Sequence, residues 1–252
     1  MAERLQVALE AARGAGALLM RHFEGGLKFR QKADRTFVSR ADEESEALIR
    51  HALLGAFASD AFNGEETGRS GAADPVWHVD PLDGTANFMH GAPGWCVSIG
   101  LQHRGEFVLG VIHEPLSGHT WCAERGGGAS CNGKRLRVST QPFENGLHLV
   151  DSYFGTARAQ PKLKYVAALA ALAPNLRMSG CSALQLAGVA SGQYLSSLSD
   201  TVKTWDFAAG AVLVREAGGV IAALEGELTA DSAVVIAANS HQTLERLRSL
   251  AR

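Results

Sequence analysis

Apolar residues recur at three- and four-residue steps at the start of the chain, at Leu5, Ala8, Leu9, Ala12, Ala15, Leu19 and Phe23. This spacing places them on one face of an amphipathic helix that the Gly25-Gly26 pair would end. Residues 27–39 are polar and predict a hairpin or a mobile loop. A second helix is expected from about 41 to 57, with Ser39 in position to cap it. The chain therefore begins with two helices joined by a short polar segment.

Short apolar or alternating runs separated by Gly and Pro turns follow, and they predict an antiparallel sheet. These runs cover 76–79, 96–101, 107–112 and 120–123. After Pro142 the pattern becomes mixed and predicts strands near 147–150 and 234–237, with helices at 165–172, 182–190, 205–216 and from 240 onward. Because no internal repeat or low-complexity linker interrupts this order, we expect one compact α/β unit.

Composition and charge narrow the class of protein. The 252 residues are 46% hydrophobic and 20% charged, which is ordinary for a globular protein. The net charge of −2 gives no reason to expect a nucleic-acid partner. The chain has no run of about 18 apolar residues that would predict a membrane span. Glu10 and Arg13 interrupt the apolar N-terminal stretch, so it does not resemble a secretory signal.

The cysteines are widely spaced and form no C-x-x-C pair. We expect small buried or half-buried thiols rather than disulfides or a zinc site. The cytoplasm is the default compartment for such a chain. The four residues are Cys96, Cys122, Cys131 and Cys181.

Acidic residues stand beside turn-forming residues in three segments, at 63–67, 77–88 and 205–210. In the second segment Val79 ends an apolar strand, and Asp80 lies where that strand meets Pro81. Because proline lacks an amide hydrogen, Pro81 is expected to stop the strand ladder. Residues 83–85 then resemble a turn that starts a short helix, and the unpaired amides of a helix start bind phosphate well.

Oxygen ligands at these positions indicate a hard cation. Asp80, Asp83 and the Leu82 carbonyl can present several oxygens to one small volume, which favours Mg²⁺, Mn²⁺ or Ca²⁺ over zinc. Simpler roles compete for each acid. The two aspartates could form a turn with a side-chain cap, Asp206 could be the N-cap of its helix, and residues 65–66 could be solvated loop acids.

With these residues in view, the sequence resembles the inositol monophosphatase family of lithium-sensitive, magnesium-dependent phosphatases. The resemblance rests on Gly-Glu-Glu at 64–66, Asp-Pro-Leu-Asp-Gly-Thr-x-Asn-Phe at 80–88 and Trp-Asp-x-Ala-Ala-Gly at 205–210. It is collinear over nearly the whole chain. It implies a layered α/β/α/β/α sandwich of the inositol monophosphatase and fructose-1,6-bisphosphatase type. Residues 1–252 would form a single phosphatase domain, with an α+β half of about 1–145 and an α/β half of about 146–252.

The resemblance also implies a ligand set for two Mg²⁺ ions, with room for a third and for Mn²⁺ in place of Mg²⁺. Asp80 would bridge the two ions. The proposed metal ligands are Glu65, Asp80, the carbonyl of Leu82, Asp83 and Asp206. The backbone amides of Gly84 and Thr85 would bind the phosphate.

The family's chemistry is hydrolysis of a phosphate monoester by an activated water that attacks in line, without a covalent intermediate. By resemblance, Glu65 and the Thr85 hydroxyl would orient and deprotonate this water, and Asp83 belongs to the same catalytic group. Glu66 would contact the residues that bind the metals and not the metals themselves. Lys32 and Asp42 would belong to a mobile loop that closes over the metals.

The part of the chain that would read the substrate departs from the inositol-phosphate pattern. Those members commonly carry an acid seven positions before the Trp-Asp aspartate, where this chain has Ser199 next to Asp200. They also tend to have Asp four positions before that acid, where this chain has Leu195. These changes leave open inositol-1-phosphate, histidinol phosphate, fructose bisphosphate and nucleotide phosphates, including NADP, as substrates. The candidate pocket residues are Arg177, Ser179, Ser182, Gln185 and Ser199.

A different class of function stays open beside the enzyme. A protein with the phosphatase scaffold could act by binding a partner in transcription or RNA handling. Retention of the acids Glu65, Asp80, Asp83 and Asp206 favours the enzyme. The resemblance further implies a homodimer, a small phosphorylated substrate, and no membrane partner.

Overall fold

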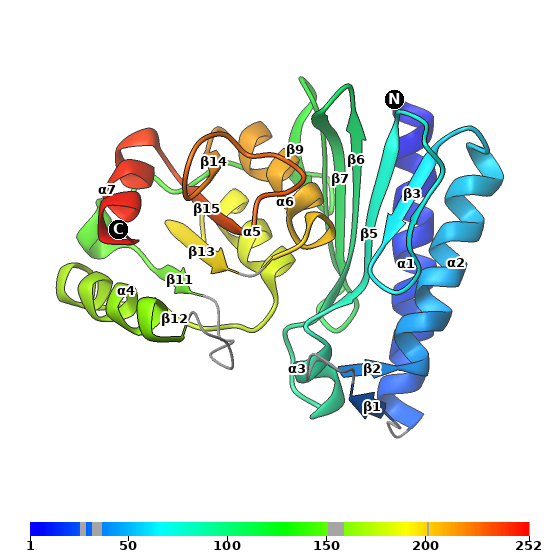
Figure 1. Ribbon diagram of the computed structural model, residues 1–252, viewed down its shortest axis with the longest axis horizontal. Helices are drawn as coiled ribbons and strands as arrows, with labels where there is room; N and C mark the ends of the chain where they lie inside the picture. The colour runs from blue at the N-terminus through cyan, green and yellow to red at the C-terminus, as the bar shows by residue number, and fades with distance from the viewer. Residues whose placement is uncertain (26–28, 32–36, 151–158, 201, 252) are drawn as a thin grey trace.

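Helices and sheets alternate across the molecule in five layers, as Figure 1 shows for the computed structural model. The structure describes residues 1–25, 29–31, 37–150, 159–200 and 202–251. Its long helices are α1 (Ala2–Gly25), α2 (Arg40–Ala56), α4 (Ala159–Leu172), α5 (Ser182–Ala190), α6 (Thr204–Glu216) and α7 (His241–Ala251). One sheet lies between the α1/α2 pair and the α5/α6 pair, and a second sheet lies between α5/α6 and the α4/α7 pair. The predicted α/β/α/β/α sandwich is therefore confirmed.

The larger sheet has eight strands in the order β10-β9-β8-β7-β6-β5-β3-β4. They are β3 (Ala61–Gly64), β4 (Gly68–Ser70), β5 (Val76–Asp83), β6 (Cys96–His103), β7 (Glu106–Glu114), β8 (His119–Glu124), β9 (Gly128–Cys131) and β10 (Lys134–Arg135). Neighbouring strands are antiparallel, as predicted, except that β3 and β5 run parallel. The expectation that Pro81 ends the ladder is wrong. The register shifts after Asp80, and pairing resumes at Asp83 opposite Cys96, so a bulge accommodates the proline.

The smaller sheet has five strands in the order β12-β11-β13-β15-β14. They are β11 (His148–Val150), β12 (Leu176–Arg177), β13 (Ser196–Asp200), β14 (Val220–Ala223) and β15 (Val234–Ala238). Strands β11 and β13 are parallel, whereas β13 and β15 are antiparallel. The sequence predicted β11 and β15 but missed the central strand β13. Four of the five residues in β13 are Ser or Asp, so the usual apolar signal of a buried strand is missing.

Helix boundaries differ little from the prediction. Helix α5 matches it, α6 begins one residue earlier, and α4 begins six residues earlier than expected. The short strands β1 (Phe29–Gln31) and β2 (Phe37–Ser39) pair in antiparallel fashion, which supports the hairpin alternative. Two short helices, α3 (Thr85–Met89) and the 3₁₀ turn at Phe143–Asn145, complete the elements.

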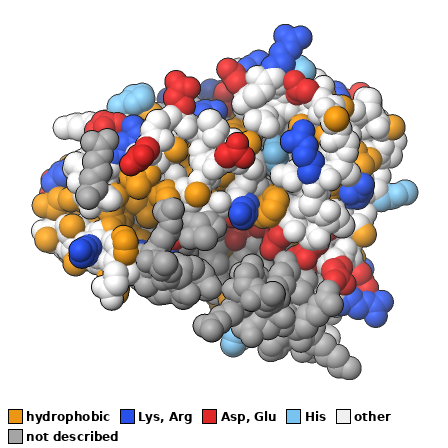
Figure 2. Space-filling view, viewed as in Figure 1, with side chains coloured by type: hydrophobic (Ala, Val, Ile, Leu, Met, Phe, Trp, Pro, Cys, Tyr) orange, Lys and Arg blue, Asp and Glu red, His pale blue; other side chains and the backbone are white. Residues whose placement is uncertain are grey.

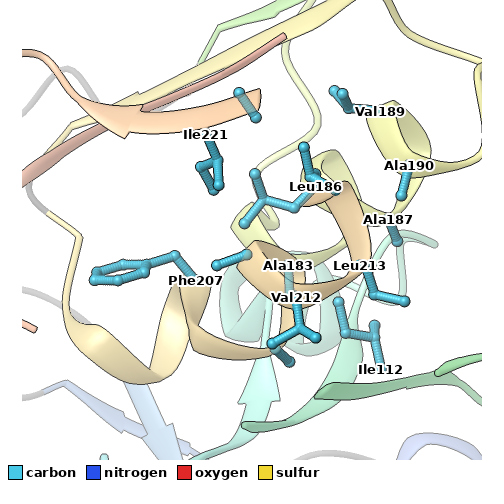
Figure 3. Close-up of a cluster of buried hydrophobic side chains, with 14 of the residues drawn as sticks. Ile112, Ala183, Leu186, Ala187, Val189, Ala190, Phe207, Val212, Leu213 and Ile221 are labelled. Carbon is cyan, nitrogen blue, oxygen red and sulfur yellow. The ribbon is translucent and has the colours of Figure 1, made fainter. Parts of the chain in front are cut away.

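The α5/α6 layer packs into the core between the two sheets. In Figure 3, Ile112 of β7 and Ile221 of β14 lie on either side of Leu186 and Leu213, and all four belong to one buried cluster. Helix α6 approaches the larger sheet so closely that a Cβ atom added at Gly100 would lie 2.6 Å from the Ala208 Cβ. Glycine in β6 therefore fixes how near α6 comes to the sheet.

No helix in the described part of the chain is long and apolar enough to span a bilayer.

Candidate metal-binding site

The last part of the buried strand β5 carries Asp80 and Asp83 on the two sides of a bulge. The Asp80 Oδ1 accepts a hydrogen bond from the Leu82 amide at 3.0 Å, and the Thr85 hydroxyl donates to the Leu82 carbonyl at 3.0 Å. The Asp83 Oδ2 accepts the Ala183 amide at 2.5 Å, in the first turn of α5. Both aspartates are therefore held by backbone contacts, and Asp83 is tied to the other half of the chain.

Gly84 makes the sharp change of direction between β5 and α3. Its φ of 89° lies in the left-handed region, which glycine adopts without strain. A Cβ atom at this position would lie 2.6 Å from the Gly94 carbonyl oxygen. The predicted short helix does begin at Thr85, directly after this turn. The sequence motif thus folds into the strand, turn and helix start that its residues predict.

Asp206 reaches the same region from the first turn of α6. The expectation that it is the N-cap needs correction, because Lys203 occupies the N-cap position and Asp206 is the third helical residue. Its Oδ2 accepts the Lys203 amide at 2.7 Å, so it still satisfies a free backbone donor at the helix start. The Ser98 hydroxyl of β6 donates to the Trp205 carbonyl at 3.2 Å and ties this helix start to the larger sheet.

Asp80 and Asp206 meet in a buried, acidic environment. Asp80 is 2% exposed and Asp206 is half-buried, and the two carboxyl groups lie close enough for the charge of Asp206 to act on Asp80. Burial raises the pKa of Asp80 well above its usual value, and the charges of Glu65, Asp83 and Asp206 add to this shift. Burial, followed by the charge of Asp83, likewise raises the pKa of Asp206. Such a group of oxygen ligands fits hard divalent cations, whose charge would stabilise the ionised carboxylates.

Glu65 is positioned by a residue that sequence reasoning missed. It begins the turn after β3, and its amide donates to the Val79 carbonyl of β5 at 3.1 Å. The buried carboxylate of Glu46 on α2 accepts the amides of Glu66 at 2.8 Å and Thr67 at 2.9 Å. Glu46 lies on the same inward helix face as Ile49 and Leu53. A charged residue on that apolar face was the available signal.

Two of the expected pocket residues lie in contact with each other. The Ser199 hydroxyl donates to the Gln185 Oε1 at 3.3 Å, and both residues are buried. The Ser179 carbonyl accepts the Asn87 side-chain amide at 2.8 Å, which joins the α3 region to the segment before α5. The Ser179 hydroxyl and the Gln185 Nε2 are buried and have no hydrogen-bond partner within the described ranges.

The other expected residues are placed less tightly. Ser182 is the half-buried first residue of α5, and Arg177 is exposed on the edge strand β12, where it donates to the Leu176 carbonyl. Asp42 is buried in the first turn of α2, so the expectation that it belongs to a mobile loop needs correction. Lys32 lies outside the described residues.

All four cysteines are free, as expected, but two of them lie together beside the acidic residues. The Sγ atoms of Cys96 and Cys181 are 3.6 Å apart in the core. Burial raises the pKa of both thiols. The wide sequence spacing gave no signal for this pair, because a strand start and a helix start bring the two residues together.

Acidic side chains are also visible on the surface of the molecule. Figure 2 shows Asp and Glu side chains, in red, gathered below the centre of this face.

The sequence and the fold both match known proteins over nearly their whole length. A model of the inositol monophosphatase family matches residues 1–252. The chain belongs to this family. Inositol-1-monophosphatase from Rhizobium meliloti is 37% identical over 235 residues, which cover 88% of this chain and 86% of that protein. Nus factor SuhB from Xylella fastidiosa is 38% identical over 226 residues, which cover 88% and 82% of the two chains.

A solved structure repeats the fold. The extragenic suppressor protein suhB from Bartonella henselae has a TM-score of 0.92 at 34% identity, with 98% of this chain and 97% of that chain covered. Membership of the inositol monophosphatase family supports phosphatase activity and metal binding at the level of the family.

Proposed function

We propose that this protein is a Mg²⁺-dependent phosphatase that hydrolyses a small phosphate monoester of the inositol-1-phosphate type. The observation that carries the proposal is the approach of the half-buried Asp206 to the buried Asp80, with the pKa values of both raised by burial and by neighbouring acids. Burying several carboxylates together is unfavourable without a cation to neutralise them. Two divalent ions would supply that charge.

The ligands would be the five groups that the family resemblance indicates. One ion would be held by Glu65, Asp80 and the Leu82 carbonyl, and a second by Asp80, Asp83 and Asp206. When bound, such ions neutralise phosphoryl oxygens and make water easier to deprotonate. Mg²⁺ is the expected metal because all donors are oxygens, and Mn²⁺ shares this preference. Lithium sensitivity and a third ion remain predictions from the resemblance.

The protein's own residues would orient the reactants. The amides of Gly84 and Thr85, at the turn between β5 and α3, would hold the phosphate, as backbone donors at a helix start do. Glu65 and the Thr85 hydroxyl would orient the attacking water and accept its proton. The hydrogen bond from the Thr85 hydroxyl to the Leu82 carbonyl supports this role, because it fixes the side chain toward the acidic group. Glu66, Asp42 and Lys32 would stabilise the region around these groups.

Inositol-1-phosphate is favoured among the substrates because a relative 37% identical to this chain is named inositol-1-monophosphatase. The Ser199–Gln185 contact brings two neutral hydrogen-bonding side chains together, which would suit a polyhydroxylated leaving group. Histidinol phosphate, fructose bisphosphate and a nucleotide phosphate are the alternatives. Arg177, Ser179 and Ser182 would complete the pocket.

The test is a phosphate-release screen across these esters with and without Mg²⁺ and Li⁺. Asp206→Asn should abolish Mg²⁺-dependent release while the protein stays folded, because asparagine can still accept the Lys203 amide. Asp231→Asn removes an exposed acid that is not among the proposed ligands and should leave the rate unchanged. Full activity in Asp206→Asn would contradict the assigned metal ligands.

A second candidate is an interaction protein that acts in transcription or RNA handling. The observation in its favour is the name Nus factor SuhB on relatives 34–38% identical to this chain. The net charge of −2 still favours a protein over a nucleic acid as the direct partner. Recovery of a stoichiometric macromolecular partner, together with no turnover on any ester, would support this candidate over the enzyme.

Three further properties belong to the proposal. Residues 1–252 act as one domain, because the acids that would hold one ion come from both halves. The four free thiols are compatible with a reducing compartment such as the cytoplasm. A homodimer is expected from the resemblance.

A further inference from the structure

Two thiols lie next to Asp83, which is one of the acids of the proposed Mg²⁺ site, and the three groups are potential ligands of a different metal ion. The thiols of Cys96 and Cys181 and one Asp83 carboxylate oxygen all lie within 4.8 Å of one another. Cys96 is the first residue of β6 and pairs with Asp83 across the sheet. Cys181 precedes α5, whose Ala183 amide binds Asp83. Strand, helix start and bulge therefore hold the three groups on a rigid frame.

The distance between the two sulfur atoms suits a shared metal ion. Two thiolates at about 2.3 Å from a tetrahedral zinc ion lie roughly 3.8 Å apart. The observed separation of the Cys96 and Cys181 Sγ atoms is 3.6 Å. A disulfide would require the sulfur atoms to approach to about 2.0 Å, which is a much larger movement. The pair is thus nearer to the geometry of two metal ligands than to that of a covalent bridge.

We infer that Cys96, Cys181 and Asp83 form a binding site for one thiophilic divalent cation, such as Zn²⁺ or Cd²⁺. Sulfur ligands select these ions over Mg²⁺, so the site differs in chemistry from the oxygen-only group beside it. Binding releases the two thiol protons to solvent, and water completes the fourth position. Asp83 is half-buried, so the carboxylate is the part of this site that is nearest to solvent, whereas both thiols are buried.

The shared carboxylate gives the site a consequence for activity, which rests on the proposed function. An ion held by Cys96, Cys181 and Asp83 draws Asp83 away from Mg²⁺. The phosphatase is therefore inhibited by thiophilic cations through these thiols. This inhibition is relieved by a chelator or a small dithiol.

Cadmium titration of the reduced full-length protein in millimolar Mg²⁺ tests the binding. Wild type should show the ultraviolet cadmium–thiolate absorption band and, by calorimetry, about one Cd²⁺ per chain. Cys181→Ser should lose the band and at least about ten-fold in affinity, a change of about 1.4 kcal/mol. This variant is expected to fold, because Cys181 is the N-cap of α5 and serine is a preferred N-cap residue. Cys96→Ala is the second variant and should behave alike.

The matched control is the Cys122→Ala/Cys131→Ala double variant, which removes two half-buried thiols and leaves the pair intact. It should retain the band and the affinity. An unchanged band in Cys181→Ser, or loss of the band in the control, would overturn the site.

A second arm measures inhibition by Zn²⁺ at fixed Mg²⁺. Cys181→Ser should require about ten-fold more Zn²⁺ for the same inhibition than wild type. Equal inhibition of both proteins would mean that Zn²⁺ acts at the oxygen ligands, and the link to activity would be wrong. If no ester is hydrolysed at all, the proposed function fails while the cadmium result still decides the site.

Discussion

Several residues at the candidate site have a backbone conformation, or carry an acidic group at a buried position, that would be unfavourable without support from neighbouring residues. Gly84 has a left-handed backbone, Asp80 is a buried acid, and Asp206 is a half-buried acid next to it. Each is held by its surroundings: Gly84 by the close approach of Gly94, Asp80 by the Leu82 amide and Asp206 by the Lys203 amide. Unfavourable features that the surrounding fold maintains are concentrated at functional sites.

Gly84→Ala should therefore destabilise the protein and abolish turnover. Its Cβ would meet the Gly94 carbonyl oxygen at 2.6 Å, and the left-handed φ of 89° would add strain. We expect a loss of about 1–3 kcal/mol in the free energy of unfolding, measured by denaturant titration. Gly91→Ala is the control, because its φ of 69° is also left-handed but nothing lies within 4 Å of the added Cβ. Equal effects of the two variants would contradict the argument.

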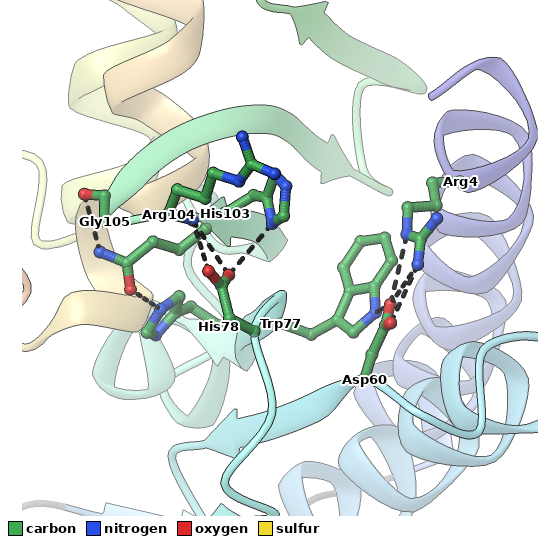
Figure 4. A network of polar contacts seen from close by, with 9 residues as sticks. Arg4, Asp60, Trp77, His78, His103, Arg104 and Gly105 are labelled. Carbon is green, nitrogen blue, oxygen red and sulfur yellow. Dashed lines mark hydrogen bonds and ion pairs between the residues drawn. The ribbon is translucent and has the colours of Figure 1, made fainter.

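His78 gives a prediction about acid stability away from the site. Figure 4 shows its ring within a network of polar contacts. The Asn63 amide donates to the Nδ1 at 3.1 Å, so the neutral ring carries its hydrogen on the Nε2, which lies 3.2 Å from the Gln102 Oε1. Burial lowers the pKa of His78 from 6.5 to about 4.

The unfolded chain binds a proton at His78 more readily than the folded chain does. The contribution of neutral His78 to the free energy of unfolding is therefore complete above pH 6.5 and is lost as the pH falls toward about 4. The loss is roughly 3 kcal/mol. His78→Gln cannot be protonated, so its unfolding free energy should fall less than that of wild type over this range. His51→Gln, at an exposed position on α2, should follow wild type. Parallel pH profiles of wild type and His78→Gln would contradict the expected shift.

At the scale of elements, the site depends on how closely α6 packs against the larger sheet. Gly100 of β6 and Gly110 of β7 lie under the Ala208-Ala209 backbone, and Ser98 binds the Trp205 carbonyl just before Asp206. The small residues of the sheet thus set the distance between the sheet and α6, the helix that carries Asp206. A core contact and a proposed metal ligand are therefore carried by the same helix.

Gly100→Ala should consequently weaken Mg²⁺ binding without touching a ligand. The added Cβ would lie 2.6 Å from the Ala208 Cβ and 2.8 Å from the Ala209 amide nitrogen, so α6 must move outward. Overpacking of this kind costs about 1–3 kcal/mol of stability. Calorimetry should show Mg²⁺ affinity lower by about ten-fold, since a ligand displaced by a fraction of an ångström binds poorly.

Gly55→Ala on α2 is the matched control, because nothing lies within 4 Å of its added Cβ. It should bind Mg²⁺ as wild type does. Unchanged Mg²⁺ affinity in folded Gly100→Ala would show that the distance between α6 and the larger sheet does not determine Mg²⁺ binding.

At the scale of the whole molecule, the sequence predicted what its local patterns encode. The Asp-Pro-Leu-Asp-Gly-Thr motif indicated a strand, turn and helix start, and helical spacing identified α1, α2 and α5. Strand β13 was missed because its serines are buried by the fold around them and not by their own hydrophobicity. Glu46 and the Cys96–Cys181 contact were missed for a related reason. Their partners lie on other elements, and single-sequence patterns do not report contacts between distant segments.

The meeting of both halves at the carboxylates predicts how metal and pH act together on stability. In the metal-free protein, burial raises the pKa of Asp80 and Asp206 above the usual 3.8, so between that value and the raised pKa the folded chain binds more protons than the unfolded chain. The stability that these acids contribute therefore falls as the pH rises through this window. Mg²⁺ binds the ionised carboxylates, so the rise in Tm that it produces should increase over the same window. Thermal unfolding with chelator and with millimolar Mg²⁺, from about pH 5 to about pH 8, measures this difference. Asp80→Asn should remove most of the Mg²⁺-induced rise, whereas Asp231→Asn should keep it. A rise in Tm that is constant with pH, or greatest in acid, would contradict a shared metal site between the two halves.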